Sequence, residues 1–277
     1  MLSLCMIVKD EEPVLARCLA SARDVADEIV VVDTGSADGT VAIARGFGAV
    51  VIHHDFADLD FGRARNRALE AARGDFALVL DADEELCAGG GEVVRRLVGG
   101  PAGAGYVATR HNHDPSGPRR AGDDHAVRLF PLRPWIRYRE RVHETVDASI
   151  LAAGGRLCRS AIEIDHYLPG AGRQREKGRF YLSLLRRDLA ADPDNVDRLT
   201  FLAAEHHRLG DFPAATRVAE RIAGLLPDDH EAHLMVALYH HAFGGDQDQA
   251  KASVRAALRL RPGDPEASAL WRELSAA

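Results

Sequence analysis

The sequence has no apolar stretch that approaches the ~20 residues needed to cross a bilayer as a helix. Its first apolar run, residues 2–8, has no basic region before it and no small-residue cleavage site after it, and charged residues 9–12 follow at once. We therefore expect this run to be a first β-strand rather than a signal peptide, and we expect no transmembrane segment.

Cysteine is scarce, and its spacing indicates neither a disulfide framework nor a zinc site. The four cysteines are far apart and form no C-x-x-C pair; they are Cys5, Cys18, Cys87 and Cys158. Together with the missing membrane segment, this pattern predicts a protein of the reducing cytoplasm.

The chain has fewer basic than acidic residues, 35 against 42. The formal net charge is −7, the isoelectric point is near 6.0, and no long basic run occurs. A nucleic-acid partner is therefore not expected. With 277 residues, of which 46% are hydrophobic and 28% charged, the chain has an ordinary globular composition and is long enough for one large domain or two modest ones.

The glycine loops of two common nucleotide-binding folds are also missing. Residues 9–13, which follow the expected first strand, contain no glycine. This excludes both the G-x-G-x-x-G fingerprint and the G-x-x-x-x-G-K-[ST] P-loop at this position. The nucleophile motif Gly-x-Ser-x-Gly does not occur either. A nucleotide site here would have to use side-chain acids and a metal ion instead.

What the first part of the chain does contain is a regular alternation of strand and helix patterns. Short apolar runs predict strands, and they are separated by segments with helical spacing. The expected strands are residues 2–8, 29–32, 50–52 and 76–80, and the expected helices are residues 14–22, 41–44 and 61–72. Short connections between alternating elements predict right-handed βαβ units and a mostly parallel sheet flanked by helices.

Farther along, the pattern is less regular. Residues 92–97 predict a helix, Gly99 to Pro101 break the chain, and residues 106–109 predict another strand. Residues 111–125 predict a mobile loop in which His111 and His113 either bind a metal or simply belong to an exposed His-rich segment. Residues 162–167 alternate like an edge strand.

The fourth strand, Phe76 to Leu80, ends directly on acids. A continuous apolar run of this length predicts a strand buried on both faces, with its carboxyl end at the edge where α/β sheets bind ligands. Asp81 and Asp83 at this edge can both reach a hard divalent cation, so we interpret Asp81-Ala82-Asp83 as a metal site for a phosphorylated ligand. The alternative is that these acids only begin a turn and cap a helix.

Acids follow other strands as well. Glu11 comes after the first strand and Asp33 after the second. Because parallel strands share one carboxyl edge, these side chains and Asp81 and Asp83 should converge there. Clustered carboxylates repel one another unless a cation or a hydrogen-bonding ligand lies among them.

Four motifs in this order resemble the family 2 glycosyltransferases of GT-A fold. They are residues 4–12, 32–40, 62–66 and 80–84, which together span roughly the first 85 residues. The resemblance implies a nucleoside-diphosphate sugar donor, most often a UDP-sugar, and a divalent cation, Mn²⁺ or Mg²⁺. It also implies that Glu11 or Glu12 and Asp33 contact the nucleoside, and that Arg63 and Arg65 lie near the diphosphate. Asp81 would contact ribose or metal, and Asp83 would bind the metal.

The resemblance continues in residues 127–131 and 142–146. An R-L-F segment followed by an H-E pair is similar to one branch of the family, which implies that Arg128 binds substrate and that Glu144 is the catalytic base. A displacement with inversion needs a carboxylate to take the acceptor's proton. The alternative is that Glu144 lies unused on a strand edge. His166 is at the place where such enzymes bring a late histidine to the metal, although a lone histidine is also compatible with a structural role.

The composition changes after Gly170 to a helical pattern rich in Ala, Leu and Arg. Pro193, Pro227 and Pro262 are 34 and 35 residues apart, and Gly210-Asp211 recurs as Gly245-Asp246. This period is typical of tetratricopeptide repeats. We therefore predict a GT-A domain over residues 1–170 and a tetratricopeptide-like domain over residues 171–277, with helices 173–191 and 265–274 as caps. The paired histidines at 206–207 and 240–241 are predicted to be neighbours on stacked helices rather than a metal site.

The sequence thus predicts a metal-dependent, inverting glycosyltransferase with an appended repeat domain. The acceptor is a glycan, a lipid-linked saccharide or a peptide side chain, and the repeats serve a protein partner, self-association or only stability. The competing hypothesis is a repeat-based adaptor whose nucleotide-sugar domain has no turnover.

Overall fold

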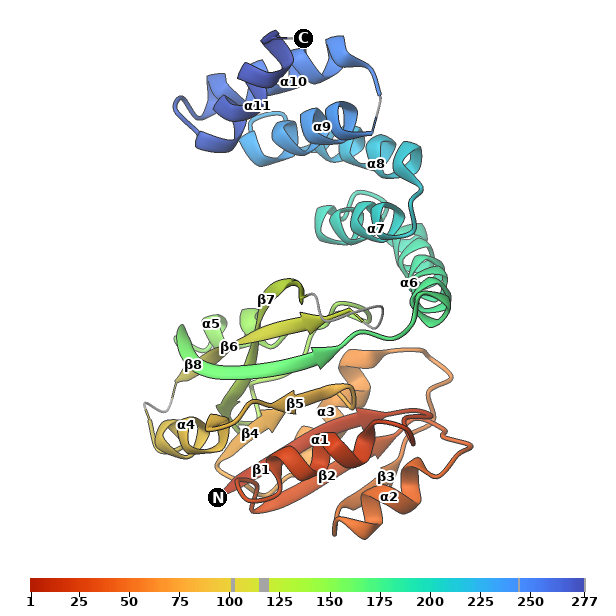
Figure 1. Ribbon diagram of the computed structural model, residues 1–277, viewed down its shortest axis with the longest axis vertical. Coiled ribbons are helices and arrows are strands. Elements are labelled where there is room, and N and C mark those ends of the chain that lie inside the picture. The colour runs from red at the N-terminus through yellow and green to blue at the C-terminus, as the bar shows by residue number, and fades with distance from the viewer. Residues whose placement is uncertain (101–102, 115–119, 244, 277) are drawn as a thin grey trace. The chain divides into compact units, whose positions relative to one another are not determined.

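The computed structural model describes residues 1–100, 103–114, 120–243 and 245–276. The chain divides into two compact units, residues 1–170 and 171–277. Figure 1 shows the first unit as a sheet covered by helices and the second as a run of helices.

The first unit is built on one mixed sheet with the strand order β3-β2-β1-β4-β7-β6-β8-β5. The strands are β1 (Leu2–Val8), β2 (Glu28–Asp33), β3 (Val50–His53), β4 (Phe76–Val79), β5 (Glu84–Leu86), β6 (Ala104–His113), β7 (Arg120–Pro131) and β8 (Arg156–Tyr167). β1 to β4 pair in parallel, as predicted, whereas β7 runs antiparallel to β4 and β6, and β5 runs antiparallel to β8. The predicted GT-A type sheet is therefore confirmed in its parallel half. The remaining strands, β5 to β8, are called the antiparallel half here, although β6 and β8 pair with each other in parallel.

Helices cover both faces of this sheet, and the side chains of β1 show how the two faces are divided. Leu4 and Met6 belong to the core that includes α1 (Leu15–Ala22), α2 (Thr40–Gly46) and α4 (Gly90–Leu97). Cys5 belongs to the opposite core, which includes α3 (Phe61–Ala71) and α5 (Asp147–Ala152). Successive residues of a strand point to opposite faces of the sheet. A strand that is apolar throughout therefore buries side chains on both faces.

Two sequence predictions about the antiparallel half are wrong. The expected loop 111–125 is instead the facing ends of β6 and β7, apart from residues 115–119, which lie outside the described residues. Its histidines and aspartates are stabilised there by cross-strand partners that local sequence does not show. The expected edge strand 162–167 belongs to β8, which is an inner strand because β5 pairs along its outer side.

The second unit consists of helices that pack on their neighbours in chain order, in agreement with the predicted helical repeats. They are α6 (Ala171–Ala191), α7 (Val196–Arg208), α8 (Phe212–Leu225), α9 (His230–Ala242), α10 (Gln247–Leu260) and α11 (Pro265–Ala276). In the part of the chain that the structure describes, no helix combines the length and the apolar character needed to span a membrane.

The helix starts of the second unit repeat with the same period as its prolines. The side chains of Asn195, Asp211, Asp229 and Asp246 cap α7, α8, α9 and α10, and each accepts hydrogen bonds from backbone N–H groups in the first turn. Asn195 and Asp229 are 34 residues apart, and Asp211 and Asp246 are 35 apart. The period seen in the sequence is thus a period of helix caps.

The paired histidines occupy repeated positions with polar partners. His206 Nδ1 lies 3.2 Å from Asp211 Oδ2, and His240 Nε2 lies 3.0 Å from Glu220 Oε1. Both imidazoles are buried. Each of these two histidines is thus held by a carboxylate, and the expected neighbourhood of the histidine pairs stays a prediction.

Replacing Asp229 by alanine is expected to lower the free energy of unfolding by about 1 kcal/mol, the usual cost of losing such a cap. Asp229 Oδ1 accepts hydrogen bonds from the N–H groups of Glu231 and Ala232, at 2.8 and 3.1 Å. Urea unfolding followed by circular dichroism measures the change. Asp228→Ala is the matched control, since Asp228 is the exposed neighbour outside this cap. Equal effects of both substitutions would contradict the assignment.

Candidate active site

The acids after β1 and β2 organise two loops against each other. Asp33 is only 2% exposed, and its carboxylate accepts hydrogen bonds from the N–H groups of Gly35 and Ser36 at 3.4 and 3.1 Å. The Glu12 carboxylate accepts from Gly39 N–H at 2.7 Å, and Glu11 N–H donates to Thr40 Oγ1 at 2.7 Å. The predicted nucleoside ligands therefore stand at one edge of the sheet, where Asp33 and Glu12 shape the loops with their carboxylates.

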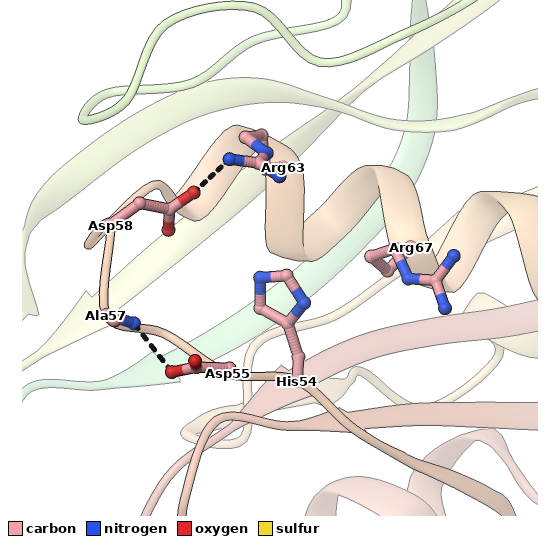
Figure 2. A pocket seen from close by; sticks show the side chains of 6 residues that line it. All are labelled: His54, Asp55, Ala57, Asp58, Arg63 and Arg67. Carbon is pink, nitrogen blue, oxygen red and sulfur yellow. Dashed lines mark hydrogen bonds and ion pairs between the residues drawn. The ribbon is translucent and has the colours of Figure 1, made fainter.

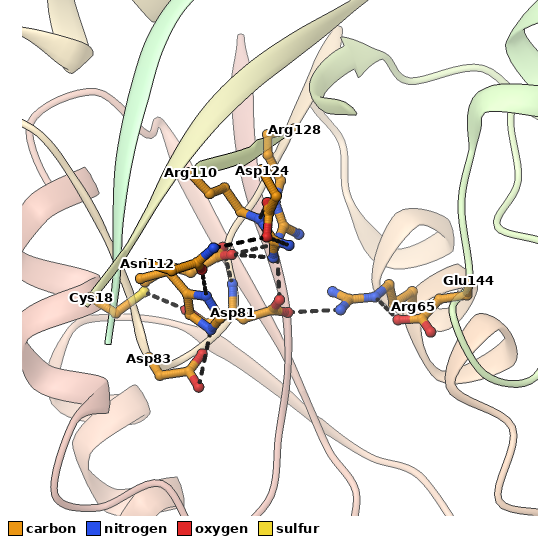
Figure 3. A network of polar contacts seen from close by, with 11 residues as sticks. Cys18, Arg65, Asp81, Asp83, Arg110, Asn112, Asp124, Arg128 and Glu144 are labelled. Carbon is orange, nitrogen blue, oxygen red and sulfur yellow. Dashed lines mark hydrogen bonds and ion pairs between the residues drawn. The ribbon is translucent and has the colours of Figure 1, made fainter. Parts of the chain in front are cut away.

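Asp81 lies at the end of β4 with an arginine on each carboxylate oxygen (Figure 3). Arg65 Nη2 donates to Oδ1 at 2.7 Å, and Arg128 Nη2 donates to Oδ2 at 3.0 Å. Burial by itself raises the pKa of the Asp81 carboxyl, but the positive charges of Arg65 and Arg128 outweigh burial and hold that pKa well below its usual range. Asp81 is thus an ionised anchor for two cationic side chains.

The same two cations contact two more acids. Arg65 Nε donates to Glu144 Oε1 at 2.6 Å, so one guanidinium joins Asp81 to a residue 63 positions farther along the chain. Arg128 Nη2 also donates to Glu84 Oε1, at 2.5 Å. Glu144 is 12% exposed at its side chain and Glu84 is fully buried. Each arginine therefore bridges two carboxylates.

Glu84 and Arg110 are site residues that the sequence prediction missed. Arg110 Nη1 donates to Glu84 Oε1 at 3.1 Å, and the rest of its guanidinium binds both carboxylate oxygens of Asp124. Glu84 Oε2 accepts from the backbone N–H of Asp81 at 2.9 Å. Glu84 follows Asp83 directly, so its position in this run of acids is the sequence signal that could have identified it as a site residue. Nothing in the sequence near Arg110 marks it.

Asp83 differs from Asp81 because its carboxylate faces a histidine instead of an arginine. His166 Nε2 lies 3.7 Å from Asp83 Oδ2, while His166 Nδ1 lies 2.6 Å from Asn112 Oδ1. The hydrogen bond to Asn112 orients the ring and leaves Nε2 turned to Asp83, an arrangement typical of metal-binding histidines. Two donors around a six-coordinate Mg²⁺ or Mn²⁺ ion lie about 3 Å apart, so this pair fits a cation with a small inward shift.

Asp81 fits the metal less well than Asp83. Both of its carboxylate oxygens are engaged by arginines, so a metal ion would have to share an oxygen with an arginine or displace it. Asp81 is therefore already neutralised by arginines from α3 and β7. Asp83 differs, since the partner described for it is a histidine.

The segment that carries Glu144 lies directly against the start of α3. Phe61 N–H donates to the backbone carbonyl of Arg141 at 3.0 Å. A methyl group on Gly62 would come within 2.4 Å of the Glu140 carbonyl oxygen, so only glycine permits this close approach. The contact fixes the distance between Arg65, one turn into α3, and Glu144.

Arg63 does not join this cluster. Its guanidinium pairs with Asp58, and it lines a pocket with His54, Asp55, Ala57, Asp58 and Arg67 (Figure 2). Residues two apart on a helix point in nearly opposite directions, so Arg63 and Arg65 leave α3 on different sides. Of these two arginines only Arg65 contacts Asp81, and their shared place near a diphosphate stays a prediction.

The low pKa of Asp81 predicts a pH dependence of stability. A carboxyl whose folded pKa is depressed stabilises the fold above its unfolded pKa of about 3.9 and loses this contribution as pH falls toward the folded value. At pH 7 we expect the free energy of unfolding of Asp81→Asn to be about 1.5–3 kcal/mol lower than that of the unsubstituted chain, and this difference should narrow progressively as pH falls below about 4. Urea unfolding between pH 7 and pH 3 measures it, with exposed Asp24→Asn as control. A difference that is as large at pH 3 as at pH 7 would contradict the ion-pair account.

Comparison with known proteins gives a consistent result. Residues 3–156 match the family described as Glycosyl transferase family 2. A TPR repeat-containing protein of Synechococcus elongatus is 37% identical over 275 residues, which cover 93% of this chain and 66% of that protein. An uncharacterized glycosyltransferase of Rickettsia typhi is 39% identical over 85 residues, which cover 31% of this chain and 28% of that protein. The chain thus spans about two thirds of the first relative and under a third of the second.

A solved structure shares the fold. The crystal structure of S. aureus TarS 1–349 in complex with UDP-GlcNAc aligns with a TM-score of 0.52 and 15% identity, over 93% of this chain and 91% of that one. At this identity the likeness concerns the fold alone.

Proposed function

The chain belongs to glycosyl transferase family 2, and on this premise we propose that it transfers a sugar from a nucleoside-diphosphate sugar to an acceptor, in a metal-dependent reaction that inverts the anomeric centre. One observation carries the proposal. Arg65 joins Asp81, beside the Asp83 and His166 pair, to Glu144, so a candidate base and candidate metal ligands stand at one site. This is the set of groups that displacement of a diphosphate requires.

Asp83 and His166 would hold the cation. When bound, an Mn²⁺ or Mg²⁺ ion neutralises the charge that develops on the leaving diphosphate. The geometry supports Asp83 as the primary ligand because its carboxylate is not engaged by an arginine in the described contacts.

Arg65 and Arg128 would bind the anionic part of the donor. Arg65 Nη1 and Arg128 Nε are buried and have no hydrogen-bond partner among the described residues, and the two side chains are only 11% and 6% exposed. Leaving a buried donor unpaired is costly, and a phosphate oxygen would satisfy it. A UDP-sugar is the first donor to test, because TarS, which shares the fold, was crystallised with UDP-GlcNAc.

Glu144 would act as the base. As the acceptor oxygen forms its bond to the anomeric carbon, the bond from that carbon to the diphosphate oxygen breaks, and the acceptor's hydroxyl proton passes to Glu144. The hydrogen bond from Arg65 Nε fixes the direction of this carboxylate, and the close contact at Gly62 holds its segment in place.

On this proposal residues 1–170 form the catalytic domain. Residues 171–277 form a tetratricopeptide-like domain that binds a partner or a second copy.

Thermal unfolding with a panel of nucleotides and nucleotide sugars tests the proposal. We expect UDP or a UDP-sugar to raise the unfolding temperature in the presence of Mn²⁺ or Mg²⁺, and EDTA to remove the shift. A ligand whose free concentration is 100 times its dissociation constant adds about 2.7 kcal/mol to the free energy of unfolding. A shift without turnover for any acceptor would favour the adaptor hypothesis, and no shift with any nucleotide would contradict the proposal.

A further inference from the structure

A second group of metal-binding side chains lies on the sheet face opposite Arg110 and His166. His111 is on β6, Glu163 is on β8, and Cys87 follows β5 directly. One ligand atom from each, a sulfur, a ring nitrogen and a carboxylate oxygen, lies within 4.8 Å of the other two. We propose that Cys87, His111 and Glu163 bind one Zn²⁺ ion, at a site that is separate from the sugar-transfer site and independent of it.

The contacts of His111 match those of a zinc ligand. His111 Nδ1 lies 3.0 Å from Asp123 Oδ1, and His111 Nε2 lies 3.9 Å from Glu163 Oε2. A neutral imidazole that donates its Nδ1–H to Asp123 presents a lone pair on Nε2, toward Glu163. This carboxylate–histidine arrangement is the one that fixes the ring of metal-bound histidines.

The fourth position has a candidate ligand beside the sulfur. Cys87 Sγ lies 3.3 Å from Asp165 Oδ2, and Asp165 also contacts His113 Nε2, at 2.6 Å. On binding, the thiol proton of Cys87 leaves for solvent and the thiolate bonds to the metal, with Asp165 or a water completing four-coordination. The set of one sulfur, one nitrogen and carboxylate oxygens suits zinc better than Mg²⁺, which prefers oxygen alone.

The required rearrangement is small. In a tetrahedral zinc site with bonds of about 2.0–2.3 Å, neighbouring ligand atoms lie about 3.4–3.7 Å apart. The three side chains therefore need to close by about 1 Å, and Glu163, which is exposed, can do so by rotation. Its exposure also gives the ion a path from solvent.

The site would connect three strands close to the transfer site. Cys87 lies just beyond β5, which begins one residue after Asp83, and its N–H donates to the backbone carbonyl of Glu163 at 3.0 Å. A bound ion would thus hold the end of this short strand to β6 and β8. Short strands with few backbone bonds gain most from such a link.

Titration of the full-length chain with Co²⁺ tests the proposal directly. The chain must be free of a polyhistidine tag, and Asp83→Asn must be present so that the proposed catalytic cation does not contribute. We expect one Co²⁺ per chain, with the absorption of a tetrahedral ion, a sulfur-to-cobalt charge-transfer band, and displacement by one equivalent of Zn²⁺. Cys87→Ser should abolish the band, whereas Cys158→Ser, the matched control on β8, should keep it.

Two further measurements separate a metal site from an ordinary ion-pair cluster. Asp123→Asn should keep the band but weaken Zn²⁺ binding by about 10–100-fold, the usual effect of removing such an orienting carboxylate. X-ray absorption of the zinc-loaded chain should show one sulfur at about 2.3 Å from the zinc and lighter ligand atoms at about 2.0–2.2 Å. This measurement does not depend on whether a substituted chain folds. The absence of a sulfur ligand, or a band that survives Cys87→Ser, would overturn the proposal.

Discussion

Asp83→Asn is expected to lower kcat/KM for sugar transfer by about 10³ or more, since the charge stabilisation by a metal ion is worth several kcal/mol and each 1.36 kcal/mol is a factor of ten. Asparagine keeps the size of the side chain but loses the negative charge that faces His166. The backbone carbonyl of residue 83, which accepts from Tyr167 N–H at 2.9 Å, is unchanged by the substitution. Steady-state transfer from the donor identified by thermal unfolding measures the loss, and circular dichroism checks the fold.

Asp24→Asn is the matched control for this experiment, because Asp24 is exposed and precedes β2, whereas Asp33 of the site edge ends that strand. It should leave kcat/KM unchanged. If Asp83→Asn retained its rate and its Mn²⁺ dependence, the metal ligand would have to be Asp81, with Arg65 or Arg128 displaced on binding.

Glu144→Gln is expected to lower kcat by about 10²–10⁴, the contribution of a general base, with little change in the affinity for the donor. Glutamine has nearly the same shape, and its amide oxygen can still accept the hydrogen bond from Arg65 Nε. It cannot take the acceptor's proton. Steady-state kinetics give kcat, and the nucleotide-induced shift in unfolding temperature gives donor binding in the same variant.

Glu140→Gln, an exposed glutamate of the same segment, is the control. A variant that loses donor binding together with kcat would indicate that Glu144 acts by holding Arg65 in place rather than as a base. Loss of kcat in Glu144→Gln with unchanged donor binding would instead support the role of Glu144 in proton transfer.

The parallel half of the sheet could be predicted from sequence because its signals are local. The apolar runs of β1, β2 and β4 and the acids that end them are contiguous, and Asp33 and Asp81 stand at the predicted edge. What surrounds these acids could not be predicted in the same way. The partners of Asp81 are 16 and 47 residues away in sequence, and no periodicity connects them.

Two differences between the sequence analysis and the structure have specific physical causes. The motif groups Arg63 with Arg65, whereas helix geometry turns them to different sides once α3 is known to begin at Phe61. The sequence around His111 predicts a loop because it is polar throughout and lacks the apolar–polar alternation that marks a strand. Hydrogen bonds across β6, β7 and β8, from residues far apart in the chain, supply the stability that apolar alternation supplies elsewhere.

The pairing of β6 with β8 makes the antiparallel half intolerant of insertions and deletions. Asn112 stands opposite His166 and His111 opposite Asp165, so residues of odd and even number serve the two faces separately. Shifting a strand by one residue exchanges its faces. Loss of a single residue from β6 would therefore turn Asn112 away from His166 and His111 away from Glu163 at once. Length variation among natural homologues should consequently be confined to the connection between β6 and β7 and be absent from the strands themselves.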